Sequence, residues 1–246
     1  MPGKDRQIIA LDVSDSRKAI ELADMLAPYA GMFKVGMELF YSQGAGIISE
    51  IKKRKGKVFL DLKLHDIPNT IYRAARALAG LGADIINVHA AGGKEMMRQA
   101  MAGVKEGAAA SGARPPLVIA VTVLTSIDQE VFNNQLGVPG PIIDSVLSWA
   151  VQAKEAGLDG VVASPLEVAA IREACGKNFV VVTPGIRPSG SDAGDQKRIM
   201  TPGQAINAGA TYIVVGRPVT AADDPVSAAM KIAAEIDLTL GKGCVG

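Results

Sequence analysis

The sequence predicts a single α/β domain over residues 1–246, folded as a (β/α)₈ barrel. Short runs rich in Val, Ile and Leu recur eight times, as expected of strands that are covered on both faces. Segments with helical spacing lie between these runs, and the alternation favours parallel βα units. Eight such units in 246 residues match the size of a (β/α)₈ barrel. The competing architecture is a doubly wound open sheet, which normally needs fewer strands per domain.

The predicted strands follow one another at regular intervals along the chain. They are QIIALDV (7–13), MFKVG (32–36), KVFLDLKL (57–64), ADIINVHA (83–90), PLVIAVTVL (116–124), LDGVVAS (158–164), FVVVTPGI (179–186) and TYIVVGR (211–217). Helices are predicted over 14–30 with Ser14 as N-cap, over 69–83 with Gly80 and Gly82 as stop signals, and over 142–157 and 224–236. The one long loop is 184–198, which is dense in Gly, Ser, Pro and Asp.

Composition gives no support to several classes of function. Lys and Arg number 26 against 25 Asp and Glu, so the net charge of +1 gives no reason to expect nucleic-acid or membrane binding. No apolar stretch approaches 18 residues, and the N-terminus lacks a signal peptide, so a cytoplasmic protein is expected. Cys175 and Cys244 form no CxxC pattern and are interpreted as free thiols in a reducing compartment.

The stretch FLDLKLHDIPNT (59–70) places charges inside a predicted strand. Side chains alternate along a strand, so Asp61 and Lys63 point one way and the leucines point the other. In a barrel the leucines face the helices, while Asp61 and Lys63 face the interior at the C-terminal mouth, where barrel enzymes place catalytic groups. The structural alternative is an ion pair that closes the top of the barrel.

Other polar residues occupy the ends of other predicted strands, which favours a ligand site over a single structural pair. They are Asp12, Lys34, His89, Thr125 and Arg217. Buried charges are costly unless paired. Lys34, Asp61, Lys63 and Asp66 form an alternating, nearly neutral array, and opposite charges ~4 Å apart attract by roughly 4 kcal/mol at an effective dielectric of ~20. Such an array holds its members without a metal.

The last two βα units predict a phosphate site. Barrels often bind phosphate after strands 7 and 8 through backbone N–H groups and a short helix N-terminus. Gly216 allows close backbone approach, and the Arg217 guanidinium suits phosphate oxygens. Arg187 and Gln196 lie on the loop that precedes them, and this loop is interpreted as a lid.

These residues together resemble the bacterial orotidine 5′-monophosphate (OMP) decarboxylases. DLKLHDIPNT closely resembles the signature of that family, and the likeness covers nearly the whole chain. It is carried, in the family's order, by ALDV, FKVG, NVHA, VTVLTS, TPGIRP, DQKR and VVGRP. The resemblance implies a (β/α)₈ homodimer that has its sites at the subunit interface. It also implies conversion of OMP to UMP and CO₂ in pyrimidine biosynthesis, without metal or cofactor.

The resemblance also assigns roles to single residues. Lys63 donates a proton to C6 of the pyrimidine, Asp61 lies beside the departing carboxylate, Lys34 positions Asp61 and the ribose hydroxyls, and Asp66 reaches the partner's site. The implied catalytic residues are therefore Lys34, Asp61, Lys63 and Asp66. The implied substrate-binding residues are Asp12, Lys34, Asp61, Leu62, Lys63, Leu64, His65, Asp66, Ile67, Pro68, Asn69, Thr70, Thr125, Arg187, Gln196, Gly216 and Arg217.

Three other functions remain open on the residues alone. A related barrel decarboxylase acts on a keto-sugar phosphate with magnesium, a Schiff-base aldolase would use Lys63 as nucleophile, and a non-catalytic barrel could sense a phosphate ligand. The HDIPNT continuation disfavours the first. Two histidines without clustered spacing make a transition-metal site unexpected. Alternation turns His65 away from Lys63, so a structural role is expected for its ring, and His89 is expected to support the site indirectly.

Overall fold

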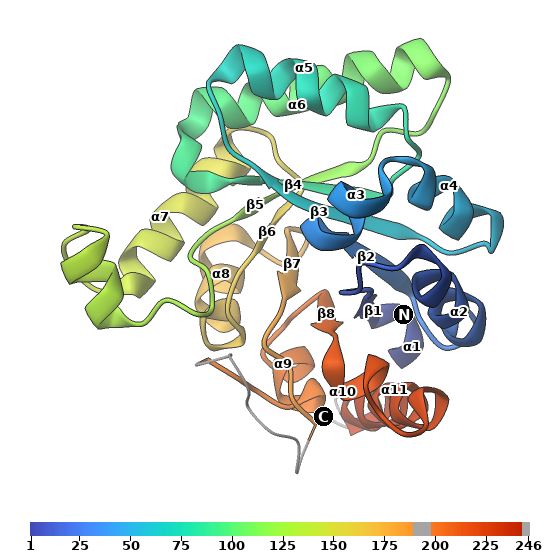
Figure 1. Ribbon diagram of the computed structural model, residues 1–246. Helices are drawn as coiled ribbons and strands as arrows, with labels where there is room; N and C mark the ends of the chain where they lie inside the picture. Colours follow the sequence, from blue (N-terminus) through green and yellow to red (C-terminus); the bar gives the residue numbers. More distant parts are fainter. Residues whose placement is uncertain (189–197, 243–246) are drawn as a thin grey trace.

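The computed structural model describes residues 1–188 and 198–242, without the side chain of Lys242. Eight parallel strands close into a barrel in the order β1 to β8, because β1 pairs with both β2 and β8 (Figure 1). The strands are β1 Gln7–Ala10, β2 Met32–Gly36, β3 Val58–Leu64, β4 Ile85–His89, β5 Leu117–Val121, β6 Gly160–Val162, β7 Val180–Thr183 and β8 Tyr212–Val215. The predicted barrel is confirmed, and the open sheet is wrong.

Helices surround the barrel and connect its strands (Figure 1). The α-helices are α1 Gly3–Arg6, α2 Ser16–Leu26, α3 Met37–Gln43, α4 Gly46–Lys53, α5 Pro68–Ala79, α6 Gly93–Ser111, α7 Ile142–Glu155, α8 Val168–Cys175, α9 Pro202–Asn207, α10 Arg217–Thr220 and α11 Pro225–Lys242. Shorter turns are the 3₁₀ helices η1 Ala90–Gly92 and η3 Pro165–Glu167, and the π-helix η2 Val131–Gln135.

Two hydrophobic clusters form the core. The smaller one fills the barrel with one side chain from each of β1 to β5 and one from β7, namely Ile8, Met32, Phe59, Ile85, Ile119 and Val182. The larger one lies between the strands and the helices, and it includes Leu60 and Leu62 of β3. The inner cluster closes the barrel below its C-terminal mouth. The polar side chains at the strand ends therefore line a cavity whose bottom is formed by apolar side chains.

The predicted helices are confirmed with corrected ends. The first begins at Ser16 because the Asp15 side chain, and not Ser14, accepts a hydrogen bond from the N–H of Arg17. It ends at Leu26, two residues before Pro28. The last helix continues beyond 236 to Lys242. The final strand stops at Val215, so Arg217 begins α10 and does not end β8.

Two sequence expectations fall partly or wholly outside the residues that the structure describes. Most of the predicted lid, including Gln196, lies in the stretch 189–197, and Cys244 lies beyond residue 242. Cys175 is a buried free thiol. Within the described ranges, no helix has the length and apolar character needed to cross a membrane.

Candidate active site

Strand β3 brings two opposite charges to the mouth of the barrel. Phe59 belongs to the inner cluster, and Asp61 follows it on the same face. Leu62 packs in the outer cluster and Leu64 packs against it. The predicted alternation therefore holds: the charges face the interior and the leucines face the helices.

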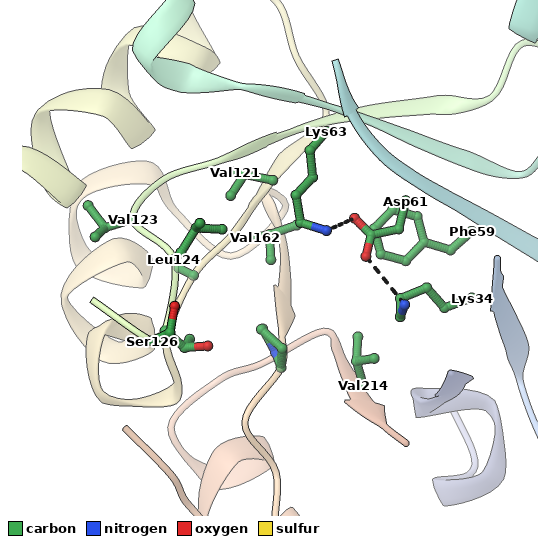
Figure 2. A pocket seen from close by; sticks show the side chains of 13 residues that line it. Lys34, Phe59, Asp61, Lys63, Val121, Val123, Leu124, Ser126, Val162 and Val214 are labelled. Atoms are coloured by element: carbon green, nitrogen blue, oxygen red, sulfur yellow. Dashed lines mark hydrogen bonds and ion pairs between the residues drawn. The ribbon is translucent and has the colours of Figure 1, made fainter. Parts of the chain in front are cut away.

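Asp61 is the centre of an ion-pair chain. Its Oδ1 atom lies 2.8 Å from Lys63 Nζ, and its Oδ2 atom lies 3.5 Å from Lys34 Nζ. Lys34 also donates a hydrogen bond of 2.8 Å to Asp12 Oδ1. Figure 2 shows Lys63 and Lys34 on either side of the Asp61 carboxylate. Four charges, from β2, from β3 and from the loop that follows β1, thus neutralise one another at the strand ends.

The ion pairs fix the charge state of both buried groups. Burial alone would raise the pKa of Asp61, but the charges of Lys34 and Lys63 and the hydrogen bonds outweigh it, so that pKa is lowered. Burial alone would lower the pKa of Lys34, but Asp61 and Asp12 outweigh it, so that pKa is raised. Asp61 therefore stabilises the fold above the pKa of an unfolded Asp, and this contribution is lost as pH falls through its lowered folded pKa. Lys34 contributes below the pKa of an unfolded Lys, and its contribution is lost as pH rises through its raised folded pKa.

A glycine makes room for the Lys34 ammonium. A β-carbon built at Gly36 would lie 2.9 Å from Lys34 Nζ and 3.3 Å from Asp12 Oδ1. The ammonium cannot retreat easily, because it is held between Asp12 and Asp61. The role of Gly36 is not evident from the sequence, since nothing local distinguishes it from a helix-capping glycine.

The strand is irregular where it carries Lys63. Lys63 has a φ of 51°, in the left-handed region that residues with a β-carbon rarely adopt. Its N–H donates to Asn87 Oδ1 at 2.8 Å, and Asn87 Nδ2 donates to Asp61 Oδ1 at 2.7 Å. Sequence reasoning missed Asn87, and the available signal was a lone amide inside the apolar run of β4.

A pocket of about 230 Å³ opens beside this array. Figure 2 shows the charged side chains on one side of it and Val123, Leu124 and Ser126 on the other. The full lining is Lys34, Phe59, Asp61, Lys63, Val121, Val123, Leu124, Thr125, Ser126, Val162, Ala163, Pro184 and Val214. The aliphatic side of such a pocket suits the face of a flat ring, and its charged side suits polar groups on the edge of that ring.

The predicted phosphate-binding residues follow β7 and β8, at the same end of the barrel. Gly216 is the N-cap of α10, and the Arg217 side chain is exposed. A β-carbon at Gly216 would meet only ordinary contacts at 3.6 Å, so packing within the chain does not demand glycine there. The backbone N–H of Arg187 donates to the carbonyl of Met200 at 3.0 Å, which brings the two flanks of the predicted lid together.

A buried ion pair that was not predicted fastens one of these flanks. Arg198 forms an ion pair with Glu167, whose other carboxylate oxygen accepts from the N–H of Ser164. Arg198 Nη2 also donates to the carbonyl of Leu124 at 3.1 Å. Since Leu124 lines the pocket, this arginine connects the end of the lid segment to the apolar wall.

The residues that follow Lys63 turn away from the pocket of their own chain. The side chains of His65, Asp66, Ile67, Asn69 and Thr70 are exposed, and Pro68 is half-buried as the first residue of α5. Within the described part of the chain, Asp66 Oδ1 accepts only a local hydrogen bond, from the N–H of Ile67 at 2.7 Å. The structure thus brings together Asp12, Lys34, Asp61, Lys63 and Thr125, but it does not bring the 65–70 side chains to them.

The two histidines lie beside each other at the edge of the site. The ring centroids of His65 and His89 are 5.4 Å apart. Burial, followed by the charges of His65 and Lys63, lowers the pKa of His89. Across residues 1–188 and 198–242, no three His, Cys, Asp or Glu side chains gather in a way that could hold a metal ion.

Comparison with known proteins matches this barrel along nearly its whole length. The orotidine 5′-phosphate decarboxylase / HUMPS family model matches residues 5–232. The chain is 57% identical to the orotidine 5′-phosphate decarboxylase of Moorella thermoacetica, over 97% of this chain and 94% of that protein. It is 52% identical to the enzyme of the same name from Syntrophomonas wolfei, over 96% of this chain and all of that one.

A solved structure agrees in fold as well. The crystal structure of orotidine 5′-phosphate decarboxylase from Lactobacillus acidophilus superposes with a TM-score of 0.82 at 43% identity, covering 94% of this chain and 98% of that one. Sequence and fold therefore agree over the same length, and the chain belongs to the orotidine 5′-phosphate decarboxylase / HUMPS family.

Proposed function

We propose that this chain converts OMP to UMP and CO₂ in pyrimidine biosynthesis, with Lys63 as the proton donor and without metal or organic cofactor. The observation that carries the proposal is the Lys34–Asp61–Lys63 array, which faces a pocket that is otherwise largely apolar. The names of the relatives, at 57% and 52% identity, support the decarboxylase activity over the other reactions considered.

The chemistry requires a cation at one ring carbon. When the bond between C6 and the carboxylate breaks, its electron pair stays on C6 in the ring plane, where the π system cannot delocalise it. A fixed ammonium group stabilises this carbanion, then transfers a proton to C6 and becomes a neutral amine that solvent reprotonates. Lys63 meets this requirement because Asp61 holds its Nζ at 2.8 Å at the edge of the pocket.

Asp61 and Lys34 prepare the site before the substrate arrives. Asp61 stays ionised at neutral pH, because its pKa is lowered by cations that outweigh its burial. It orients the Lys63 ammonium through Oδ1, while Lys34 fixes the second carboxylate oxygen. In our proposal Lys34 and Asp12 bind the ribose hydroxyls, and Thr125, which lines the pocket, contacts the base.

The 5′-phosphate is proposed to bind where β7 and β8 end. Arg217 and the backbone N–H of Gly216 are the expected ligands, with Arg187 and Gln196 on the segment that closes over them. Binding energy from this remote group supports catalysis when it is used to close and order the site. Arg198 pairs with Glu167 and also bonds to the carbonyl of Leu124, so it would couple the closure of this segment to the position of the apolar wall.

We also propose a homodimer whose sites use residues of both chains. Asp66, Ile67 and Thr70 are exposed at the mouth of the barrel and do not line their own pocket. Large apolar side chains are exposed on and near the same rim, with exposed fractions of 66% for Ile67 and 70% for Tyr41 of α3. Large apolar side chains that stay exposed on one chain are suited to packing against a second chain. A cytoplasmic location accords with this proposed biosynthetic role.

The proposed reaction is expected to proceed at the same rate with and without EDTA. Purified protein is dialysed against EDTA, and the loss of OMP absorbance is followed in metal-free buffer and again after Mg²⁺ is added. Equal rates are expected because lysine and not a metal supplies the positive charge. Activity that is abolished by EDTA and restored by Mg²⁺ would support a magnesium decarboxylase instead. Binding of OMP without turnover would support a non-catalytic sensor. Covalent trapping of the substrate on the protein by borohydride would support a Schiff-base aldolase.

Gly36→Ala is expected to lower kcat/KM for OMP about tenfold. The added methyl group would displace Lys34 and, through it, Asp61, and a shift of up to about 1 Å in a catalytic group has an effect of this order. The new methyl group would lie within 2.9 Å of Lys34 Nζ. Gly46→Ala is the matched control, since nothing lies within 4 Å of a β-carbon built there. Steady-state kinetics on both variants test this expectation, and equal kcat/KM values would contradict the crowding argument.

A further inference from the structure

Asn87 is the most buried polar side chain that touches the charge array. It belongs to β4, is 1% exposed, and uses both ends of its carboxamide within the array. The oxygen accepts from the N–H of Lys63 at 2.8 Å, and the nitrogen donates to Asp61 Oδ1 at 2.7 Å. The two contacts fix the orientation of the amide, since a backbone N–H needs an acceptor and a carboxylate needs a donor.

Asn87 lies opposite the irregular part of β3. Leu60 pairs with Ile86 and Leu64 pairs with Val88, so three residues of β3 face the single residue Asn87 on β4. A bulge of this kind leaves backbone groups without ladder partners and redirects side chains. Asn87 supplies the missing partner for the N–H of Lys63.

The bulge places Lys63 in a costly backbone conformation. A φ of 51° is disfavoured for a residue with a β-carbon, and such conformations persist only where neighbouring groups hold them. The hydrogen bond from the N–H of Lys63 to Asn87 is one such restraint. The second contact of Asn87 fixes Asp61 Oδ1, which is the same atom that pairs with Lys63 Nζ.

We propose that Asn87 is a positioning residue for the decarboxylation, which holds the backbone of Lys63 and the carboxylate of Asp61 in one geometry. It does not line the pocket and therefore acts through these two residues. This inference rests on the proposed function. It adds a residue from β4 to an array otherwise built from β2, β3 and the loop after β1.

Asn87→Asp tests the two contacts separately. Aspartate is nearly the same size as asparagine, so it keeps the acceptor for the N–H of Lys63 but, when ionised, lacks the donor to Asp61. Its carboxylate can still accept from the N–H of Lys63, but it repels the Asp61 carboxylate where the amide donated. Two carboxyl groups this close share a proton, and the protonated Asp would donate to Asp61 as the amide does. The other titratable groups that face this point are Lys63 on β3, Lys34 on β2, His89 on β4 and His65 after β3. Wild type contains all of these, so comparison with it isolates position 87.

The expected result is a change in the pH profile. At pH ~8, Asn87→Asp is expected to lose about 100-fold in kcat with KM changed less than about threefold, the scale of an ångström of misplacement in a catalytic group. The deficit relative to wild type should shrink as pH falls toward ~5. Asn87→Leu, which loses both contacts, should show a similar deficit that does not shrink. Thr122→Val is the control, because Thr122 is only 3% exposed and, among the described residues, its hydroxyl bonds only to the carbonyl of Val162.

The kinetic experiment uses wild type and the three variants side by side on OMP between pH ~5 and ~8, with circular dichroism to measure the folded fraction. Turnover of OMP by wild type tests the proposed function. If wild type shows no turnover, that function is rejected, and the positioning role of Asn87 is rejected with it. With wild type active, the positioning role is overturned if Asn87→Asp stays within about threefold of wild type at pH ~8. It is equally overturned if the deficit of Asn87→Asp is the same at every pH. If Asn87→Leu does not fold, the pH profile of Asn87→Asp alone decides between these results.

Discussion

Lys63→Ala is expected to reduce kcat for OMP by a factor on the order of 10³ or more, because it removes both an electrostatic stabiliser and the proton donor. Lys34, the other cation that lines the pocket among the described residues, lies on the far side of Asp61. It cannot replace Lys63 without leaving both Asp12 and Asp61. The measurement is steady-state turnover at saturating OMP.

The same variant is expected to keep its fold. The Lys63 side chain is 26% exposed, so its loss opens no sealed cavity. Asp61 keeps two partners, with Lys34 Nζ at 3.5 Å and Asn87 Nδ2 at 2.7 Å. The buried carboxylate therefore remains paired. Only a buried charge that loses all its partners would strongly destabilise the protein. Thermal unfolding should remain cooperative.

Lys52→Ala is the matched control. Lys52 pairs with Asp84 at 2.8 Å, the same distance as in the Lys63–Asp61 pair, but Asp84 immediately precedes β4 at the opposite end of the barrel. It should have nearly wild-type kcat. A Lys63→Ala protein that retains a tenth of wild-type activity would exclude Lys63 as the proton donor, whatever the control shows.

The barrel and its charged mouth could be predicted from the sequence because both depend on local periodicity. Val- and Ile-rich runs mark buried parallel strands, and a period of two places Asp61 and Lys63 on one face. The prediction for the two charges succeeded even though β3 is irregular, because Lys63 still lines the pocket and pairs with Asp61. Helix ends were less certain, as Asp15 and Ser14 are both good N-caps and only the geometry distinguishes them.

The contacts that were missed join residues far apart in the chain. Asn87 is 24 residues from Lys63, and its register depends on a bulge that no local pattern announces. Arg198 follows β7, whereas its partners belong to other βα units: Glu167 follows β6 and the carbonyl of Leu124 follows β5. Such long-range pairings follow from how the barrel closes. Propensity and periodicity describe each strand alone, so they do not specify which polar side chains meet.

The role of Asp66 depends on a second subunit and gives the other large expected effect. Lys63→Ala and Asp66→Asn proteins should each be nearly inactive alone. Mixed and allowed to exchange subunits, they should recover about a quarter of wild-type activity per total site, because random exchange makes half of the dimers mixed and one site in each mixed dimer is intact. The other site of that dimer carries both lesions. Exchange is verified separately with two distinguishable affinity tags.

The control for this experiment is a mixture of Lys63→Ala with Lys34→Ala. Lys34, Asp61 and Lys63 contact one another within one chain, so every site of that mixed dimer carries one lesion and no activity should return. Recovery in the first mixture but not in the second therefore requires Asp66 to serve the neighbouring chain's site. The exposed carboxylate of Asp66, turned away from its own pocket, leads us to expect that outcome. If neither mixture recovers although exchange is demonstrated, Asp66 serves the site of its own chain and the composite-site proposal is wrong.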